Sequence, residues 1–155
     1  MNWIKVPILL IGAMFLQWWV STHIWSPLLL LVLTIAVSAR LGATTGMLCG
    51  FVWGLFLDVL RAHLFGGNAL VFTLAAYGTG MARRQIDVVG VGPQATIVLV
   101  MSWVYFVLMG LLGLIFTRVF FWPGWKVVLL TPIYNCILVP FVYVFLERFM
   151  AEGRR

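Results

Sequence analysis

The chain has 155 residues, of which 64% are hydrophobic and 9% are charged, and its mean hydropathy is +1.12. A soluble domain carries about 25% charged residues, so this composition excludes an ordinary soluble globular protein. A membrane-spanning helix takes about 20 apolar residues, which leaves room for about six spans, short loops and no separate soluble domain. The net charge of +6 comes from single or paired Lys and Arg residues between apolar runs. Such spacing is typical of topology signals and lipid-headgroup contacts, and no nucleic-acid partner is expected.

Six apolar runs follow one another along the chain and predict an all-α integral membrane protein, a six-transmembrane-helix bundle that forms a single membrane domain over residues 1–155. The first run follows a lone Lys5, as in a signal peptide, but no small-residue cleavage site comes after it. We therefore expect it to be retained as a span. The expected spans are about residues 6–20, 25–39, 43–60, 68–82, 94–117 and 127–146.

The basic residues indicate which side of the membrane holds the termini, because cytoplasmic loops carry an excess of Lys and Arg. With six spans, seven basic residues lie on the side of the termini and three lie on the other. This predicts a multi-pass protein with both termini in the cytoplasm. The segment 120–125, Phe-Phe-Trp-Pro-Gly-Trp, is then an outer turn that either anchors in the interface or docks a partner. The outer ends also carry an expected interfacial belt of tryptophans, Trp18, Trp19, Trp25, Trp122 and Trp125.

Glycines recur at every fourth position around the third run and lead at the same spacing to an acidic residue, giving Gly42, Gly46, Gly50, Gly54 and Asp58. Glycines at i and i+4 form one ridge of a helix and let another backbone approach closely, which is a main source of helix association in lipid. We therefore expect the third span to be the central helix. Its ridge packs either within the bundle or against a partner helix.

Asp58 is the expected polar centre of the chain, because a carboxylate at membrane depth is costly unless it faces a polar interior or a cation. Arg61 lies three residues further along the same helix face and is the expected counter-ion. Asn68 ends a Gly-Gly-Asn turn and is suited to cap the next helix. These residues predict either a stabilised turn or a polar site at the mouth of a pocket.

The remaining polar side chains within the runs do not form a catalytic set. Gln17, Tyr77, Tyr134 and Asn135 either line an interior cavity or satisfy one another by hydrogen bonds. Four acidic residues and two histidines offer no converging acid–base group, no three-ligand metal site and no phosphate-binding loop. We expect no enzymatic activity, no cofactor and no metal.

The segment 50–58, the Gly-Gly-Asn turn at 66–68, Tyr77 and the pair Arg83-Arg84 together resemble the bacterial rod shape-determining protein MreD family. The close match covers about residues 42–87. The resemblance implies a non-enzymatic scaffold of the cell-elongation (rod) complex in the inner (cytoplasmic) membrane. Such a scaffold binds MreC, acts indirectly with MreB, RodA and a class B penicillin-binding transpeptidase, and supports peptidoglycan synthesis and rod shape. Partner-binding or pocket roles then fall to Asp58, Arg61, Asn68 and Tyr77.

The same resemblance implies a fold, the six-helix arrangement of the S components of energy-coupling-factor transporters. This sets the alternative function, a vitamin-binding S component. An S component docks on its transport module through a face of small residues, typically with an AxxxA pattern. The first run offers only Gly12 and Ala13 among large apolar residues, so the scaffold is the favoured hypothesis.

Overall fold

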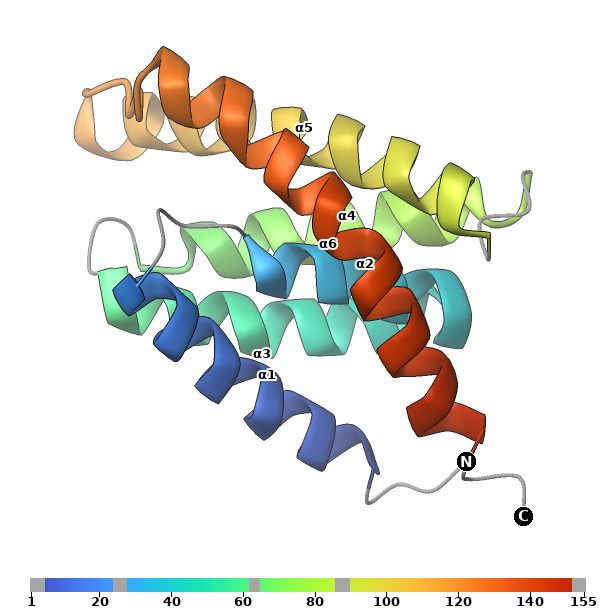
Figure 1. The fold of residues 1–155 in the computed structure, drawn as a ribbon. Helices are drawn as coiled ribbons and strands as arrows, with labels where there is room; N and C mark the ends of the chain where they lie inside the picture. Colours follow the sequence, from blue (N-terminus) through green and yellow to red (C-terminus); the bar gives the residue numbers. More distant parts are fainter. Residues whose placement is uncertain (1–4, 24–27, 62–64, 86–89, 152–155) are drawn as a thin grey trace.

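The protein is all-helical in the computed structural model, which describes residues 5–23, 28–61, 65–85 and 90–151. The expected six helices are present, close to the apolar runs that predict them (Figure 1). Their bounds are α1 (Lys5–His23), α2 (Leu29–Leu41), α3 (Ala43–Arg61), α4 (Gly67–Ala82), α5 (Val91–Thr117) and α6 (Trp125–Ala151).

Three of these helices are long and apolar enough to cross a membrane when the described residues are searched: Ala43–Leu60, Val91–Thr117 and Trp125–Arg148. The apolar parts of α1 and α2, Leu10–Trp19 and Leu29–Leu41, are shorter, and α4 has 16 residues. The chain is thus a membrane protein with several candidate spans. A full crossing by each of α1, α2 and α4 stays a prediction.

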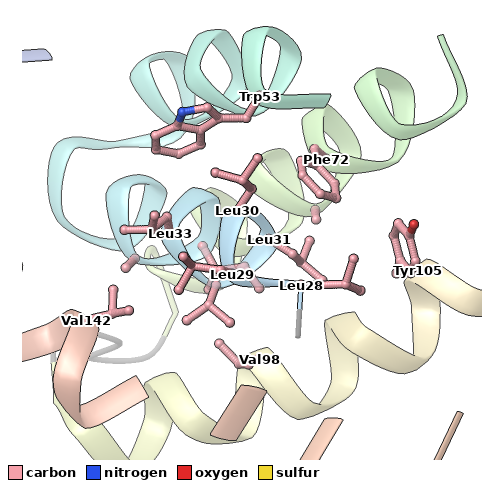
Figure 2. Close-up of a cluster of buried hydrophobic side chains, with 14 of the residues drawn as sticks. Leu28, Leu29, Leu30, Leu31, Leu33, Trp53, Phe72, Val98, Tyr105 and Val142 are labelled. Carbon is pink, nitrogen blue, oxygen red and sulfur yellow. The ribbon is translucent and has the colours of Figure 1, made fainter. Parts of the chain in front are cut away.

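The central helix is α2, and the expectation that the third span would be central is wrong. Every residue from Leu29 to Ala39 is buried, and α2 contacts each of the other five helices. Figure 2 shows its leucines enclosed by residues from several helices, among them Trp53, Phe72 and Val142. The third span, α3, instead leaves Leu48, among others, exposed. A glycine ridge marks where two backbones approach closely, and it does not require that the helix be enclosed on all sides.

The other helices surround α2 in two pairs and a single helix. Helices α3 and α4 pack closely side by side, and α5 and α6 form a second pair. Within the part of the chain that the structure describes, α1 contacts only α2 and α3. The first residues of α1 and the last residues of α6 lie toward the same end of the bundle (Figure 1).

The turn between α5 and α6 folds back onto α5. A Cβ built on Gly110 would overlap the ring of Phe120, and one built on Gly113 would overlap Phe121, so these two glycines make room for the two rings. Trp122 stacks on Phe120 with ring centroids 6.0 Å apart and meets Trp125 edge-on at 5.0 Å. The turn is therefore an ordered aromatic cluster held on its own helix pair.

Candidate functional site

Asp58, near the end of α3, is buried and caps the start of α4. Its Oδ2 accepts hydrogen bonds from the backbone N–H groups of Gly66 at 3.0 Å and Ala69 at 3.1 Å. Its Oδ1 accepts the backbone N–H of Asn68 at 3.0 Å and the side-chain Nδ2 of Asn68 at 2.8 Å. The first N–H groups of a helix have no partner within the helix and carry its positive dipole end, so a carboxylate there is stabilised. Asp58 of α3 thus caps the N-terminal end of the neighbouring helix α4, whose N-cap position is Gly66.

The expected ion pair between Asp58 and Arg61 stays a prediction. Arg61 is the last residue of α3, and its side chain lies outside the described residues. The four hydrogen bonds to Asp58 satisfy the carboxylate without any cation, which removes the physical argument that made Arg61 necessary.

Gly66 supplies the sharp turn before α4 with φ of 90°, a left-handed conformation that favours glycine.

A third residue extends this cap to α5. The Tyr105 hydroxyl donates a hydrogen bond of 2.7 Å to Oδ1 of Asn68, and its ring lies against Phe72 and Phe106. Asp58, Asn68 and Tyr105, here called the Asp58 network, therefore connect α3, α4 and α5. Tyr105 is not among the site residues expected from the sequence. The available signal was a tyrosine within an apolar run, since a buried hydroxyl needs a partner.

A second polar group joins α6 to the central helix. Asn135 accepts the backbone N–H of Leu28 at 3.1 Å and donates to the hydroxyl of Ser102 at 2.8 Å. On the other side, Gln17 of α1 accepts the backbone N–H of Leu30 at 3.3 Å. Side chains from α1 and α6 thus satisfy N–H groups at the start of α2, which has no side-chain cap of its own. Both amides act as hydrogen-bond links between helices.

Tyr77 and Tyr134, which were grouped with Gln17 and Asn135 as polar residues of the apolar runs, do not lie in the interior. Tyr77 is 50% exposed and Tyr134 is 44% exposed. Tyr77 lies nine positions after Asn68 on α4, which corresponds to about 14 Å along a helix axis. The structure therefore does not bring Tyr77 to the Asp58 network, and its ring faces outward.

The glycine ridge packs α3 against two neighbours within the bundle. A Cβ on Gly46 would overlap Ser38 of α2, and a Cβ on Gly54 would overlap the backbone of Ala69 in α4. At Gly50 an added Cβ would lie 2.8 Å from Thr34 Cγ2 and 3.0 Å from the carbonyl oxygen of Phe72. Gly42 differs, because it ends α2 with φ of 101° and lies before α3 begins.

These contacts define the class of protein: a helical membrane bundle whose buried polar groups hold helices together. Within the described ranges, no group of three or more His, Cys, Asp or Glu side chains is placed to hold a metal ion. The Asp58 carboxylate and the Asn68 amide are engaged in bonds to the chain itself.

Residues 1–149 match the family of the rod shape-determining protein MreD, and the chain belongs to that family. Its members are non-enzymatic morphogenetic membrane proteins with a role in rod shape determination. No curated protein and no solved structure matches the chain.

Proposed function

We propose that this chain is a membrane scaffold of the rod complex that binds MreC and so supports peptidoglycan synthesis. The observation that carries the proposal is the family match over residues 1–149. MreB, RodA and a class B penicillin-binding transpeptidase are its indirect partners in this proposal. We also propose that the six helices adopt the fold of the S components, which an experimental structure of the protein would test.

The packing of the bundle supports a scaffold. The central helix α2 contacts every other helix, and the Asp58 network and Asn135 link five of the six helices by hydrogen bonds, with Gln17 adding α1. Buried polar contacts of this kind favour one arrangement of helices over others. A protein that presents a surface to a partner needs such a defined arrangement.

Both termini lie in the cytoplasm in this proposal. The end of the bundle where α1 begins and α6 ends also carries Arg83, Arg84 and Arg148, whereas Arg118 and Lys126 lie at the opposite end. The larger share of basic residues on the side of the termini supports a cytoplasmic placement.

The residues assigned to partner binding act in two ways. Asp58 and Asn68 are buried, so they act by shaping the α3–α4 turn. The exposed Tyr77 ring on α4 is available for direct contact with a membrane helix of MreC. Arg61, at the end of α3, belongs to the same proposed surface.

Affinity purification of the tagged chain from its native host in mild detergent, with mass spectrometry of both proteins and small molecules, tests the proposal. We expect MreC to be recovered together with wall-synthesis enzymes. Recovery of ATPase and transmembrane transport subunits with a bound vitamin would instead establish the alternative, an S component.

Variants separate direct contact from folding in the same purification. Tyr77→Ala and Arg61→Ala are expected to reduce the recovered MreC several-fold while the amount of purified chain stays unchanged. The matched control is Tyr134→Ala, which removes a similarly exposed tyrosine from α6. Equal MreC recovery with all three variants would refute the assigned surface.

A further inference from the structure

The turn between α5 and α6 joins two candidate membrane spans, at the end of the bundle opposite the first residues of α1 and the last residues of α6 (Figure 1). Each of the two helices has 27 residues, which corresponds to a length of about 40 Å. The hydrocarbon core of a bilayer is about 30 Å thick. A helix pair of this length extends past the core even at the usual tilt, so its ends reach the headgroup region.

The chain folds back along α5 after this helix ends. A Cβ built on Gly113 would be 2.8 Å from the carbonyl oxygen of Val119, and one built on Gly110 would overlap the ring of Phe120. Gly113 and Gly110 lie four and seven positions before the last residue of α5, which corresponds to about 6 Å and about 10 Å along the helix axis. The turn therefore lies beside the last two turns of α5, and the Phe120 ring reaches deeper than the turn's own backbone.

The tip of α5 is apolar on all sides. Ile115 and Phe116 are each 70% exposed, and the preceding Leu114 is exposed as well. Three successive residues of a helix point in three different directions, because a turn takes 3.6 residues. Water is an unfavourable neighbour for such a group of side chains. A single packed helix would cover one stripe of this tip, whereas lipid surrounds it.

The backbone of the turn decides how deep it can lie. Residues 118–124 are not helical. Irregular backbone exposed to lipid does not occur in the hydrocarbon region, because its N–H and C=O groups would lack partners there. Among the headgroups, water and polar lipid groups supply those partners. The backbone of the turn thus fits the headgroup region, and its rings fit the edge of the hydrocarbon.

The charged and aromatic side chains around the turn suit phospholipid. Arg118 and Lys126 are exposed on either side of it, and the exposed acidic residue among those described, Glu147, lies near the other end of α6. Lys and Arg side chains reach headgroup phosphates while their aliphatic parts stay in apolar surroundings. The indoles of Trp122 and Trp125 are exposed too, and amphipathic rings of this kind favour the membrane interface.

We infer that the α5–α6 turn is an anchor in the phospholipid headgroup region, with the rings of Phe120 and Phe121 inserted at the edge of the hydrocarbon core. The phospholipid of one leaflet, and not a partner protein, covers this end of the helix pair. The anchor fixes the depth of α5 and α6 in the bilayer. The inference depends neither on MreC binding nor on the side of the membrane that holds the termini.

Spin labels on single cysteines test the placement of the turn. The full chain, with Cys49 and Cys136 replaced by alanine, is placed one copy per disc in nanodiscs of phosphatidylcholine and phosphatidylglycerol. Electron paramagnetic resonance then measures how often each label collides with oxygen, which dissolves in lipid, and with a water-soluble nickel chelate. The elution volume of each labelled protein shows that it is folded and monodisperse.

Two labels report the turn and two serve as references. Ile115→Cys and Val119→Cys carry the reporting labels at exposed positions. Ile137→Cys, at an exposed position near the middle of α6, gives the lipid reference. Gln85→Cys, at an exposed position after the end of α4, gives the water reference.

We expect nickel collisions at both reporting labels to be several-fold rarer than at Gln85→Cys, with oxygen collisions close to those at Ile137→Cys. Nickel collisions as frequent as at the water reference would place the turn in water and overturn the inference. Rare collisions with both reagents would show that protein covers the turn, and would overturn phospholipid as its occupant.

Gly110→Val tests whether the ring contact holds the turn in place, because the added side chain takes the space of the Phe120 ring. We expect it to raise the nickel collisions of the Val119→Cys label several-fold. The matched control is Gly92→Val on the same helix, where nothing lies within 4 Å of an added Cβ, and it should leave the collisions unchanged. If Gly110→Val does not fold, Gly110→Ala takes its place with a smaller expected rise. Collisions equal to those of the control would overturn the folded-back arrangement of the anchor.

Discussion

The Asp58 carboxylate receives three backbone N–H groups and one side-chain amide from the start of α4. The sequence predicts a polar centre at this residue and a nearby cation as the partner of its charge. The structure satisfies the charge with N–H donors, which a list of residues along the chain does not reveal. The donors come from residues eight to eleven positions later, and only the folded turn brings them to the carboxylate.

Asp58→Asn is expected to lower the free energy of unfolding by about 2–3 kcal/mol. The amide keeps one acceptor oxygen, and its NH2 group replaces the other and then faces the backbone N–H donors of α4. The unfolding midpoint in detergent measures the effect. The matched control is Glu147→Gln, an exposed carboxylate on α6, for which the midpoint should stay unchanged. A midpoint for Asp58→Asn equal to that of the control would contradict the capping role.

Gly54→Ala tests the close approach of α3 and α4. An added Cβ overlaps the backbone of Ala69, so the two helices must move apart, and we expect a loss of about 1–3 kcal/mol. Gly12→Ala is the control, because nothing lies within 4 Å of a Cβ at that position, and it should be neutral or stabilising by up to about 1 kcal/mol. Equal stability of the two variants in thermal unfolding would show that the ridge is not a packing contact.

At the level of elements, the apolar runs predict the helices well. The run expected at 43–60 becomes Ala43–Arg61, and the run at 127–146 becomes Trp125–Ala151. The central helix was not predictable in the same way. Apolar sequence is required both of a helix that faces lipid and of one enclosed by protein, so composition alone cannot separate α2 from α5. The partnership of Tyr105 with Asn68 depends likewise on how α5 packs on α4, which no local pattern encodes.

Asn135→Leu tests the link between α6 and the start of α2. It removes the acceptor of the Leu28 N–H and the donor to Ser102, and we expect a loss of about 1–3 kcal/mol from the unpaired groups that remain. Tyr134→Phe, at the neighbouring exposed position, is the control. Thermal unfolding that does not distinguish the two variants would contradict the assigned link.

At the scale of the whole molecule, the proposed orientation predicts which loops an impermeant reagent reaches. With Cys49 and Cys136 replaced by alanine, single cysteines at the exposed positions Arg84 and Arg118 report the two ends of the bundle. In spheroplasts with an intact cytoplasmic membrane, a charged maleimide should label Arg118→Cys. It should label Arg84→Cys only after the cytoplasmic membrane is permeabilised. The opposite labelling pattern would show that the proposed topology is inverted.

The family to which the chain belongs has a role in rod shape determination, and we propose that this chain fulfils it by binding MreC directly. The most direct measurement mixes the purified chain with purified MreC in detergent, without other rod proteins, and determines the mass of the eluting species by light scattering. We expect one species that contains both proteins and that persists at micromolar concentration, with Glu147→Gln behaving as the unmodified chain. Two separately eluting proteins at that concentration would contradict it.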